Sequence, residues 1–212
     1  MTSLDAALER EARRLLERYQ AEVVERFGLC PWAEPARARG EVRVAIVDGD
    51  VDAAGAALDA FLADASAAIG LVVMPRFAGD PRALRHLRDE LLAGERARVL
   101  ALADFHPVAL RDDSAPGRLV PWLRRSPDPM LQAVRHETLA SLRRETTTLA
   151  SAAQVAAIAG RAPPPRTDPA AAVAVANLAL VRARGDAVAA ALDDIARDRD
   201  ATYAALGVST RR

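Results

Sequence analysis

The stretch LVVMPRFAGDPRALRHLRDELLAG, residues 71–94, carries the two signals that decide the fold. LVVM (71–74) is a short, continuous apolar run, which is the pattern of a strand covered on both faces. Asp80-Pro81 then supplies an N-cap and a first-turn proline, and Gly94 ends the helix that they begin. A buried strand followed closely by a helix is typical of α/β folds.

Two further apolar runs flank this unit, VRVAIV (42–47) and VLALA (99–103), and a helix is expected at about 51–67. The resulting β-α-β-α-β order predicts parallel strands with crossover helices. An amphipathic helix is expected at 3–27, capped by Thr2 or Ser3 and ended by Gly28. The predicted fold class is therefore α/β. It has a small three-stranded or slightly larger, parallel or mixed sheet flanked by helices, with an N-terminal helix and a helical C-terminal part.

The second half of the chain is expected to be mainly helical. Predicted helices cover about 128–144, beginning at Asp128-Pro129, and then 149–159, 169–184 and 186–205, the last two divided by Gly185. A proline-rich link at 161–168 marks the one candidate boundary. We therefore expect an α/β core over 1–160 with a signature loop at 104–130. A helical extension over 161–212 is expected to pack on it, giving a single domain overall.

Composition excludes several classes of protein. Acidic and basic side chains balance at 29 each, so no net charge draws the chain to nucleic acid or to an anionic membrane. Lysine is absent, which excludes a Schiff-base lysine and a Walker A lysine. A single cysteine, Cys30, excludes an intramolecular disulfide and fits a reducing compartment. The N-terminal segment is charged and no apolar run approaches a membrane span, so we expect a soluble cytoplasmic protein. We also expect no cofactor and no metal.

The carboxyl ends of the predicted strands point to a candidate site, because ligands of parallel α/β sheets bind beyond those ends. The third run is followed by Asp104-Phe105-His106-Pro107. We predict His106 as a general acid or base, with Asp104 beside it as the second catalytic candidate. The alternative is that His106 only locks the loop through hydrogen bonds.

A basic cluster, Arg124-Arg125-Ser126, precedes the helix expected from Asp128-Pro129. Two guanidinium groups, a hydroxyl and free N–H groups at a helix start suit a phosphate or carboxylate, so these residues are predicted ligand contacts. The alternative is a solvated basic turn in which Asp128 caps the helix. The connection of about 19 residues at 108–126 is long enough for a lid or binding loop.

Cys30 invites the hypothesis of a nucleophile, but its position after a helix C-terminus and beside Trp32 disfavours a thiolate. A buried structural cysteine is the favoured interpretation. Cys30, His106 and His136 lack the ligand spacing of a zinc site, and His86 is expected to be exposed on its helix.

Four stretches together resemble a bacterial family known as domain of unknown function 1415. They are GLCPWA (28–33), LVVMP (71–75), DFHP (104–107) and RRSPDPMLQAVRHE (124–137). The resemblance implies a compact cytoplasmic α/β protein, carries no established reaction, and adds Arg135 and Cys30 to the candidate ligand contacts. At positions 74, 124, 128, 132 and 136 the chain departs from the family pattern with Met74, Arg124, Asp128, Gln132 and His136.

Three functions remain open on the sequence. The first is an enzyme acting on a small anionic metabolite, with His106 as acid or base and Arg125 with Ser126 holding the anion. The second is a non-catalytic module that binds such a ligand in the same pocket. The third is an interaction protein, or a homodimer, that uses the C-terminal helices as its contact face.

Overall fold

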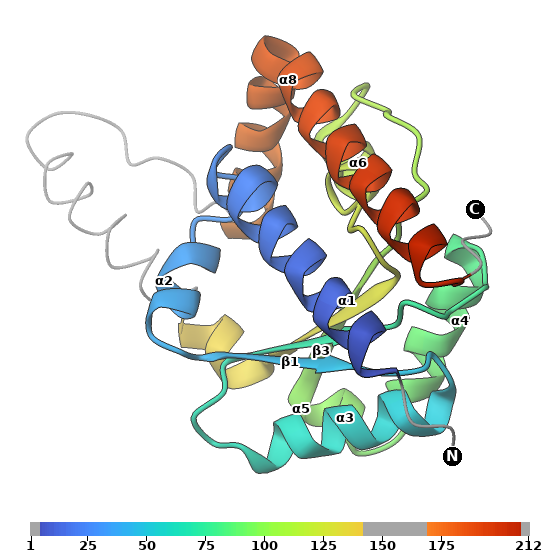
Figure 1. The fold of residues 1–212 in the computed structure, drawn as a ribbon. Coiled ribbons are helices and arrows are strands. Elements are labelled where there is room, and N and C mark those ends of the chain that lie inside the picture. Colours follow the sequence, from blue (N-terminus) through green and yellow to red (C-terminus); the bar gives the residue numbers. More distant parts are fainter. Residues whose placement is uncertain (1–4, 142–168, 209–212) are drawn as a thin grey trace, which may run out of the picture.

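A four-stranded mixed sheet lies between two layers of helices in the computed structural model, which describes residues 5–141 and 169–208 (Figure 1). The strand order is β1-β2-β4-β3, with bounds β1 Val42–Ile46, β2 Ile69–Val73, β3 Leu100–Phe105 and β4 Met130–Arg135. One face of the sheet packs on α1 (Ala6–Tyr19), α6 (Pro116–Leu123) and α8 (Pro169–Ala205), and the other packs on α3 (Val51–Ala63) and α4 (Pro81–Leu91). The expected α/β class with a small sheet is confirmed.

The three predicted strands run in one direction, but only two of them are neighbours. β1 pairs with β2 in parallel, in the register Val42↔Ile69. β4 lies between β2 and β3 and pairs with both in antiparallel fashion. The expectation that the three strands are direct parallel neighbours is therefore wrong for β3.

β4 corrects the helix expected from Asp128-Pro129 to about Arg144. Residues 130–135 form a strand, and helix begins only at His136, continuing to the last described residue of this stretch, Ser141. The Asp-Pro signal misled because neither residue caps a helix here, and Pro129 instead accepts a hydrogen bond from the N–H of Met74. In MLQAVR, Leu131 and Ala133 face the α3/α4 layer while Met130 faces the α1/α8 layer, which is the two-residue period of a strand.

The first helical layer begins with α1 (Ala6–Tyr19), which continues into a π-helical turn, η1 (Gln20–Glu25). Asp5 caps α1, accepting a hydrogen bond from the N–H of Ala7 at 2.8 Å; the expected caps Thr2 and Ser3 lie outside the described residues. Gly28 ends this segment at φ +64°, as predicted, and short α2 (Ala33–Ala38) follows.

The same layer holds α6 (Pro116–Leu123), which occupies part of the predicted 108–126 connection, and α8 (Pro169–Ala205). α8 spans both predicted C-terminal helices, and the expected break appears as a kink at Arg184. A Cβ at Gly185 would lie 2.6 Å from the Arg111 guanidinium, so a larger residue there would require that flexible side chain to shift. The helix predicted at 149–159 and the link at 161–168 lie outside the described residues.

The opposite layer consists of α3 (Val51–Ala63), α4 (Pro81–Leu91) and the short α5 (Arg96–Val99). Asp80 caps α4 by accepting a hydrogen bond from the N–H of Ala83 at 2.8 Å, as the Asp-Pro pattern predicts. Asp50 caps α3 in the same way, with the N–H of Ala53 at 2.7 Å. His86 is exposed on α4, as expected.

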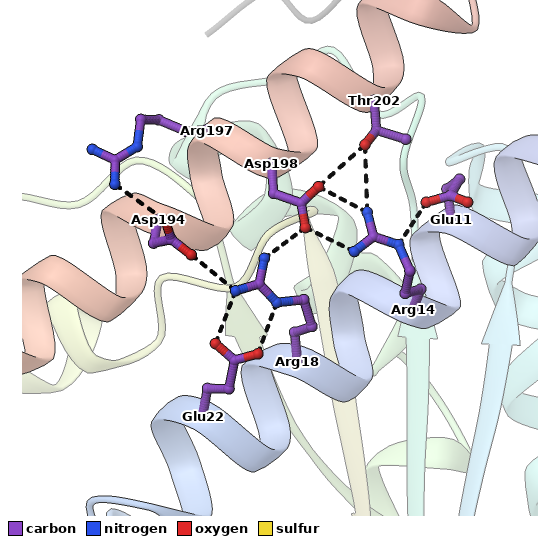
Figure 2. A network of polar contacts seen from close by, with 8 residues as sticks. All are labelled: Glu11, Arg14, Arg18, Glu22, Asp194, Arg197, Asp198 and Thr202. Carbon is purple, nitrogen blue, oxygen red and sulfur yellow. Dashed lines mark hydrogen bonds and ion pairs between the residues drawn. The ribbon is translucent and has the colours of Figure 1, made fainter.

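A polar network joins α1 to α8 along the surface (Figure 2). Asp198 accepts hydrogen bonds from Arg14 at 2.7 Å and from Arg18 at 2.6 Å, and Arg18 also reaches Asp194 at 2.9 Å. Hydrogen bonding to Arg14 and Arg18 holds the pKa of the Asp198 carboxyl well below its usual range. Tyr203 and Ile195 of α8 are buried in the core, so α8 is an integral part of the fold.

None of the helices in the described part of the chain combines the length and apolar character that a membrane span requires.

Candidate functional site

His106 lies beyond the carboxyl end of β3, at the edge of the sheet where β1 and β2 also end. Its Nδ1 accepts a hydrogen bond from the N–H of Val108 at 3.1 Å, so in the neutral ring Nε2 carries the hydrogen. Nε2 in turn lies 3.1 Å from the carbonyl oxygen of Gly79. Burial lowers the pKa of His106, which favours this neutral form. The contacts match the loop-locking interpretation.

Asp104 points to the other face of the sheet from Phe105. Its carboxylate accepts a short hydrogen bond from Arg88 of α4. Asp104 and His106 therefore make separate contacts, with α4 and with Gly79 respectively, and no hydrogen bond joins their side chains among the described residues.

Arg124 lies beside the outer edge of β3, with its guanidinium stacked on the ring of Phe105 at 5.3 Å. Burial lowers the pKa of Arg124, and the nearby Asp104 opposes that shift. No hydrogen bond or ion pair joins its guanidinium to another described residue. Its nitrogens still reach solvent, because the described part of the structure contains no fully buried side-chain nitrogen or oxygen without a partner.

Arg125 and Ser126 lie close to His106 in space, because the His106 N–H donates to the carbonyl of Arg124, but both side chains bind protein groups. Arg125 donates to the carbonyl of Pro107 at 3.2 Å and to Asp193 of α8 at 3.1 Å. The Ser126 hydroxyl is buried and donates to the carbonyl of Asp128. Because the following segment is β4, the helix N-terminus expected to assist an anion here is absent.

Asp128 is a residue that the sequence interpretation placed wrongly, as the N-cap of a helix. Its side chain is 1 % exposed and accepts hydrogen bonds from Arg199 at 2.7 Å and from the Tyr203 hydroxyl at 2.6 Å. Burial raises the pKa of the Asp128 carboxyl, while Arg199 and Tyr203 act in the opposite direction. This buried ion pair ties the 124–129 segment to α8.

Arg135 lies at the opposite end of β4 from Ser126, away from His106 and Arg125, but it lines the same hollow beside α2 as Cys30. Its guanidinium donates to the carbonyls of Phe61, Leu62, Asp64 and Ala67, at 2.9 to 3.2 Å. It also stacks on the Phe61 ring at 5.0 Å. These contacts close the C-terminal end of α3, where unpaired carbonyls and the helix dipole favour a cation.

Cys30 is half-buried where α2 approaches the sheet. Burial raises the pKa of the Cys30 thiol, and the backbone N–H groups of Trp32 and Ala33 only partly oppose this. The thiol is therefore protonated at neutral pH, which fits a structural rather than nucleophilic cysteine, although Cys30 is half-buried and not fully buried as expected.

We expect Cys30 to react slowly with Ellman's reagent at pH 7 while the protein is folded, because only the thiolate is the nucleophile. The same protein in concentrated urea is the control, and there the thiol should react at the rate of an unperturbed cysteine. Folded-state labelling that matches or exceeds the urea rate would restore the nucleophile hypothesis.

Two neighbouring hollows with shared lining residues lie next to Cys30. The first, here called the inner cavity, has a volume of about 90 Å³ and lies between α1 and the sheet. Its lining is mostly apolar, with Leu16, Val24, Leu71 and Phe105, and includes Tyr19 and Gln20. The second, here called the outer groove, has a volume of about 610 Å³. It runs between α2, residues 65–69 and the C-terminal end of β4, with Trp32 on its wall.

Three residues line both hollows: Cys30, Ile69 and Gln132. Gln132 lies in β4, which has a strand on each side, and its amide makes no hydrogen bond to another described residue. Gln132 is half-buried, and because no fully buried side-chain nitrogen or oxygen among the described residues lacks a partner, its amide is accessible from these hollows. Sequence reasoning noted Gln132 only as a departure from a family pattern, since the segment was assigned to a helix.

No group of three or more His, Cys, Asp or Glu side chains in residues 5–141 and 169–208 is arranged to hold a metal ion. His136 lies near the carbonyl of Ala97, at 3.2 Å, whereas His106 binds Gly79.

Comparison with known proteins adds no relative: the chain matches no protein-family model, no curated protein and no solved structure.

Proposed function

We propose that this protein is a non-catalytic module that binds a small organic molecule in the outer groove and inner cavity. One observation carries the proposal: Gln132 lines both hollows and offers an amide that no described residue engages. An amide supplies both donors and an acceptor, so it can fix the orientation of a ligand. A largely apolar hollow with few polar groups is the usual composition of a small-molecule site.

The lining defines the class of ligand. The inner cavity accepts an apolar group, because Leu16, Val24 and Phe105 form its walls. The outer groove has room for a larger polar part beside Trp32, Ser66 and Thr138. The ligand that fits best therefore has an apolar end and a carboxylate or amide that hydrogen-bonds to Gln132.

Binding is favoured over catalysis by the contacts of the candidate catalytic groups. Both ring nitrogens of His106 are engaged by the backbone, and Asp104 binds Arg88. Arg125, proposed as an anion holder for an enzyme, binds Pro107 and Asp193. An enzyme acting on an anionic metabolite would first have to break these contacts.

An anionic ligand remains the second candidate, and Arg124 supports it. Its guanidinium stacks on Phe105, and Phe105 also lines the inner cavity. A bound anion stabilises a partly desolvated cation that has no ion-pair partner. The anion would then lie at the outer edge of β3.

Two further elements of the proposal rest on the sequence. The four stretches that resemble domain of unknown function 1415 support membership of that family. The single cysteine supports a cytoplasmic location.

A thermal-shift screen of small carboxylates and amides tests the proposed function. Each compound that stabilises the protein is then titrated against the Gln132→Leu and Arg125→Ala variants. Loss of the amide hydrogen bond in Gln132→Leu is expected to cost about 1 kcal/mol of binding, roughly fivefold in affinity. Arg125→Ala is the matched control and should bind normally. If Arg125→Ala alone weakened binding of the compound, the ligand would instead lie at the 124–126 segment. The expected loss would then be about 1.5–3 kcal/mol, the usual scale for a hydrogen bond to a charged group.

A further inference from the structure

The outer edge of β1 carries backbone groups that face away from the sheet. β1 is an edge strand with β2 as its neighbour. The N–H of Val47 donates to Val73 at 2.9 Å, and the carbonyl of Glu41 accepts from Ile69 at 3.1 Å. Odd-numbered residues of this segment therefore bond to β2. Because the bonding direction alternates along a strand, the N–H and C=O groups of Val42, Val44 and Ile46 point outward.

These outward groups have little protection. The guanidinium of Arg43 reaches the carbonyl of Val42 at 3.5 Å and that of Gly40 at 2.7 Å. No hydrogen bond joins the outward groups of Val44 and Ile46 to another described residue. α1 and α3 cover the two faces of the sheet and leave its edge open (Figure 1). A row of unpaired groups on a strand edge is a template for a further strand.

We propose that a second copy of this chain occupies the edge, with the two β1 strands antiparallel about a two-fold axis. In the register centred on Val44, Val44 faces the partner's Val44, and Val42 faces the partner's Ile46. Each of these pairs can exchange two hydrogen bonds, because the outward groups of both strands meet. The two four-stranded sheets then form one continuous sheet.

Charge favours the antiparallel over the parallel orientation. Arg39 and Arg43 lie at the start of β1, where they pair with Glu41 and Asp64, whereas Asp50 and Asp48, which pairs with Arg76, lie just beyond its end. Antiparallel pairing sets Arg39 of each strand near Asp48 and Asp50 of the other, whereas parallel pairing would set Arg39 beside the partner's Arg39.

The contact face expected on the C-terminal helix fits a dimer less well. Most apolar residues of α8 are buried in the protein's own core. They include Leu178, Val181, Val188, Leu192 and Ile195. Among the described residues of α8, Val175 is the large apolar side chain that is exposed, at 59 %.

Light scattering across a dilution series tests the proposal, with Val44→Pro as the variant. Proline removes the outward N–H of Val44 and leaves the hydrogen bonds to β2 intact. We expect a mass of twice one chain for the wild type. In the variant the dimer should be at least about tenfold weaker, because both copies lose a donor. A monomeric wild type, or a dimer that Val44→Pro leaves equally tight, would overturn the proposal.

Amide hydrogen exchange provides a second measurement on the unmodified protein. The N–H groups of Val44 and Ile46 should become protected as protein concentration rises. Those of Arg43 and Ala45, which face β2, should be protected at every concentration and serve as the internal control. Exchange at Val44 and Ile46 that does not depend on concentration would overturn the proposal even if Val44→Pro fails to fold.

Discussion

Replacing Asp128 by asparagine is expected to lower the free energy of unfolding by about 3 kcal/mol, the usual cost of removing one partner of a buried ion pair. The change leaves the guanidinium of Arg199, a residue that is 8 % exposed, without its buried counter-charge. It also weakens the acceptor of the Tyr203 hydroxyl, which lies 2.6 Å from the carboxylate. Because Asp128 lies just before β4 while Arg199 and Tyr203 lie on α8, the loss loosens α8 from the sheet.

Urea unfolding followed by circular dichroism measures this effect. Asp194→Asn is the matched control, because Asp194 also binds an arginine, Arg18 at 2.9 Å, but on the protein surface. Solvent screens that pair, so the control should shift the unfolding midpoint far less. Equal shifts in the two variants would contradict the structural role assigned to Asp128.

The second large effect is expected for Arg135→Met, at about 2 kcal/mol of lost stability, on the scale of hydrogen bonds to a charged group. Methionine keeps much of the apolar length of the side chain but removes the donors to the carbonyls of Phe61, Leu62 and Asp64. The C-terminal end of α3 then loses its cation, and the stacking on Phe61 is lost with it.

Thermal unfolding of Arg135→Met is compared with that of Arg98→Met. Arg98 pairs with Glu95 at 3.0 Å, but its side chain is 76 % exposed, so the control should unfold like the wild type. If Arg135→Met were equally neutral, Arg135 would be free for the ligand role that the family resemblance implied. In the structure its guanidinium binds carbonyls at the end of α3, and its side chain also lines the outer groove.

The strand and cap signals of the first hundred residues could be predicted because each depends on local sequence. LVVM, Asp80-Pro81 and Gly28 act within a few residues of themselves, and all three behave as expected. β4 could not be found in this way. Its start resembles a helix N-terminus, and what makes it a strand is the slot between β2 and β3, which only the tertiary fold provides.

The same distinction between local signals and long-range contacts applies to the candidate site. The position of His106 at the sheet edge follows from the strand that precedes it, and this part was predictable. The contact between the His106 ring and the carbonyl of Gly79 joins residues 27 positions apart. The ion pair of Asp128 with Arg199 joins residues 71 positions apart. Gln132 had a usable signal, since it is a polar residue among apolar ones in MLQAV, but only for a segment already assigned to a strand.

Residue-resolved NMR with the most strongly stabilising compound from the thermal-shift screen is the most direct test of the proposed binding function. We predict that amide signals of Cys30, Trp32, Ile69 and Gln132 shift and saturate as the compound is added. The His106 ring should meanwhile keep its hydrogen on Nε2. Saturating shifts confined to His106, Arg125 and Ser126, with Gln132 unchanged, would contradict the account and return the site to the end of β3.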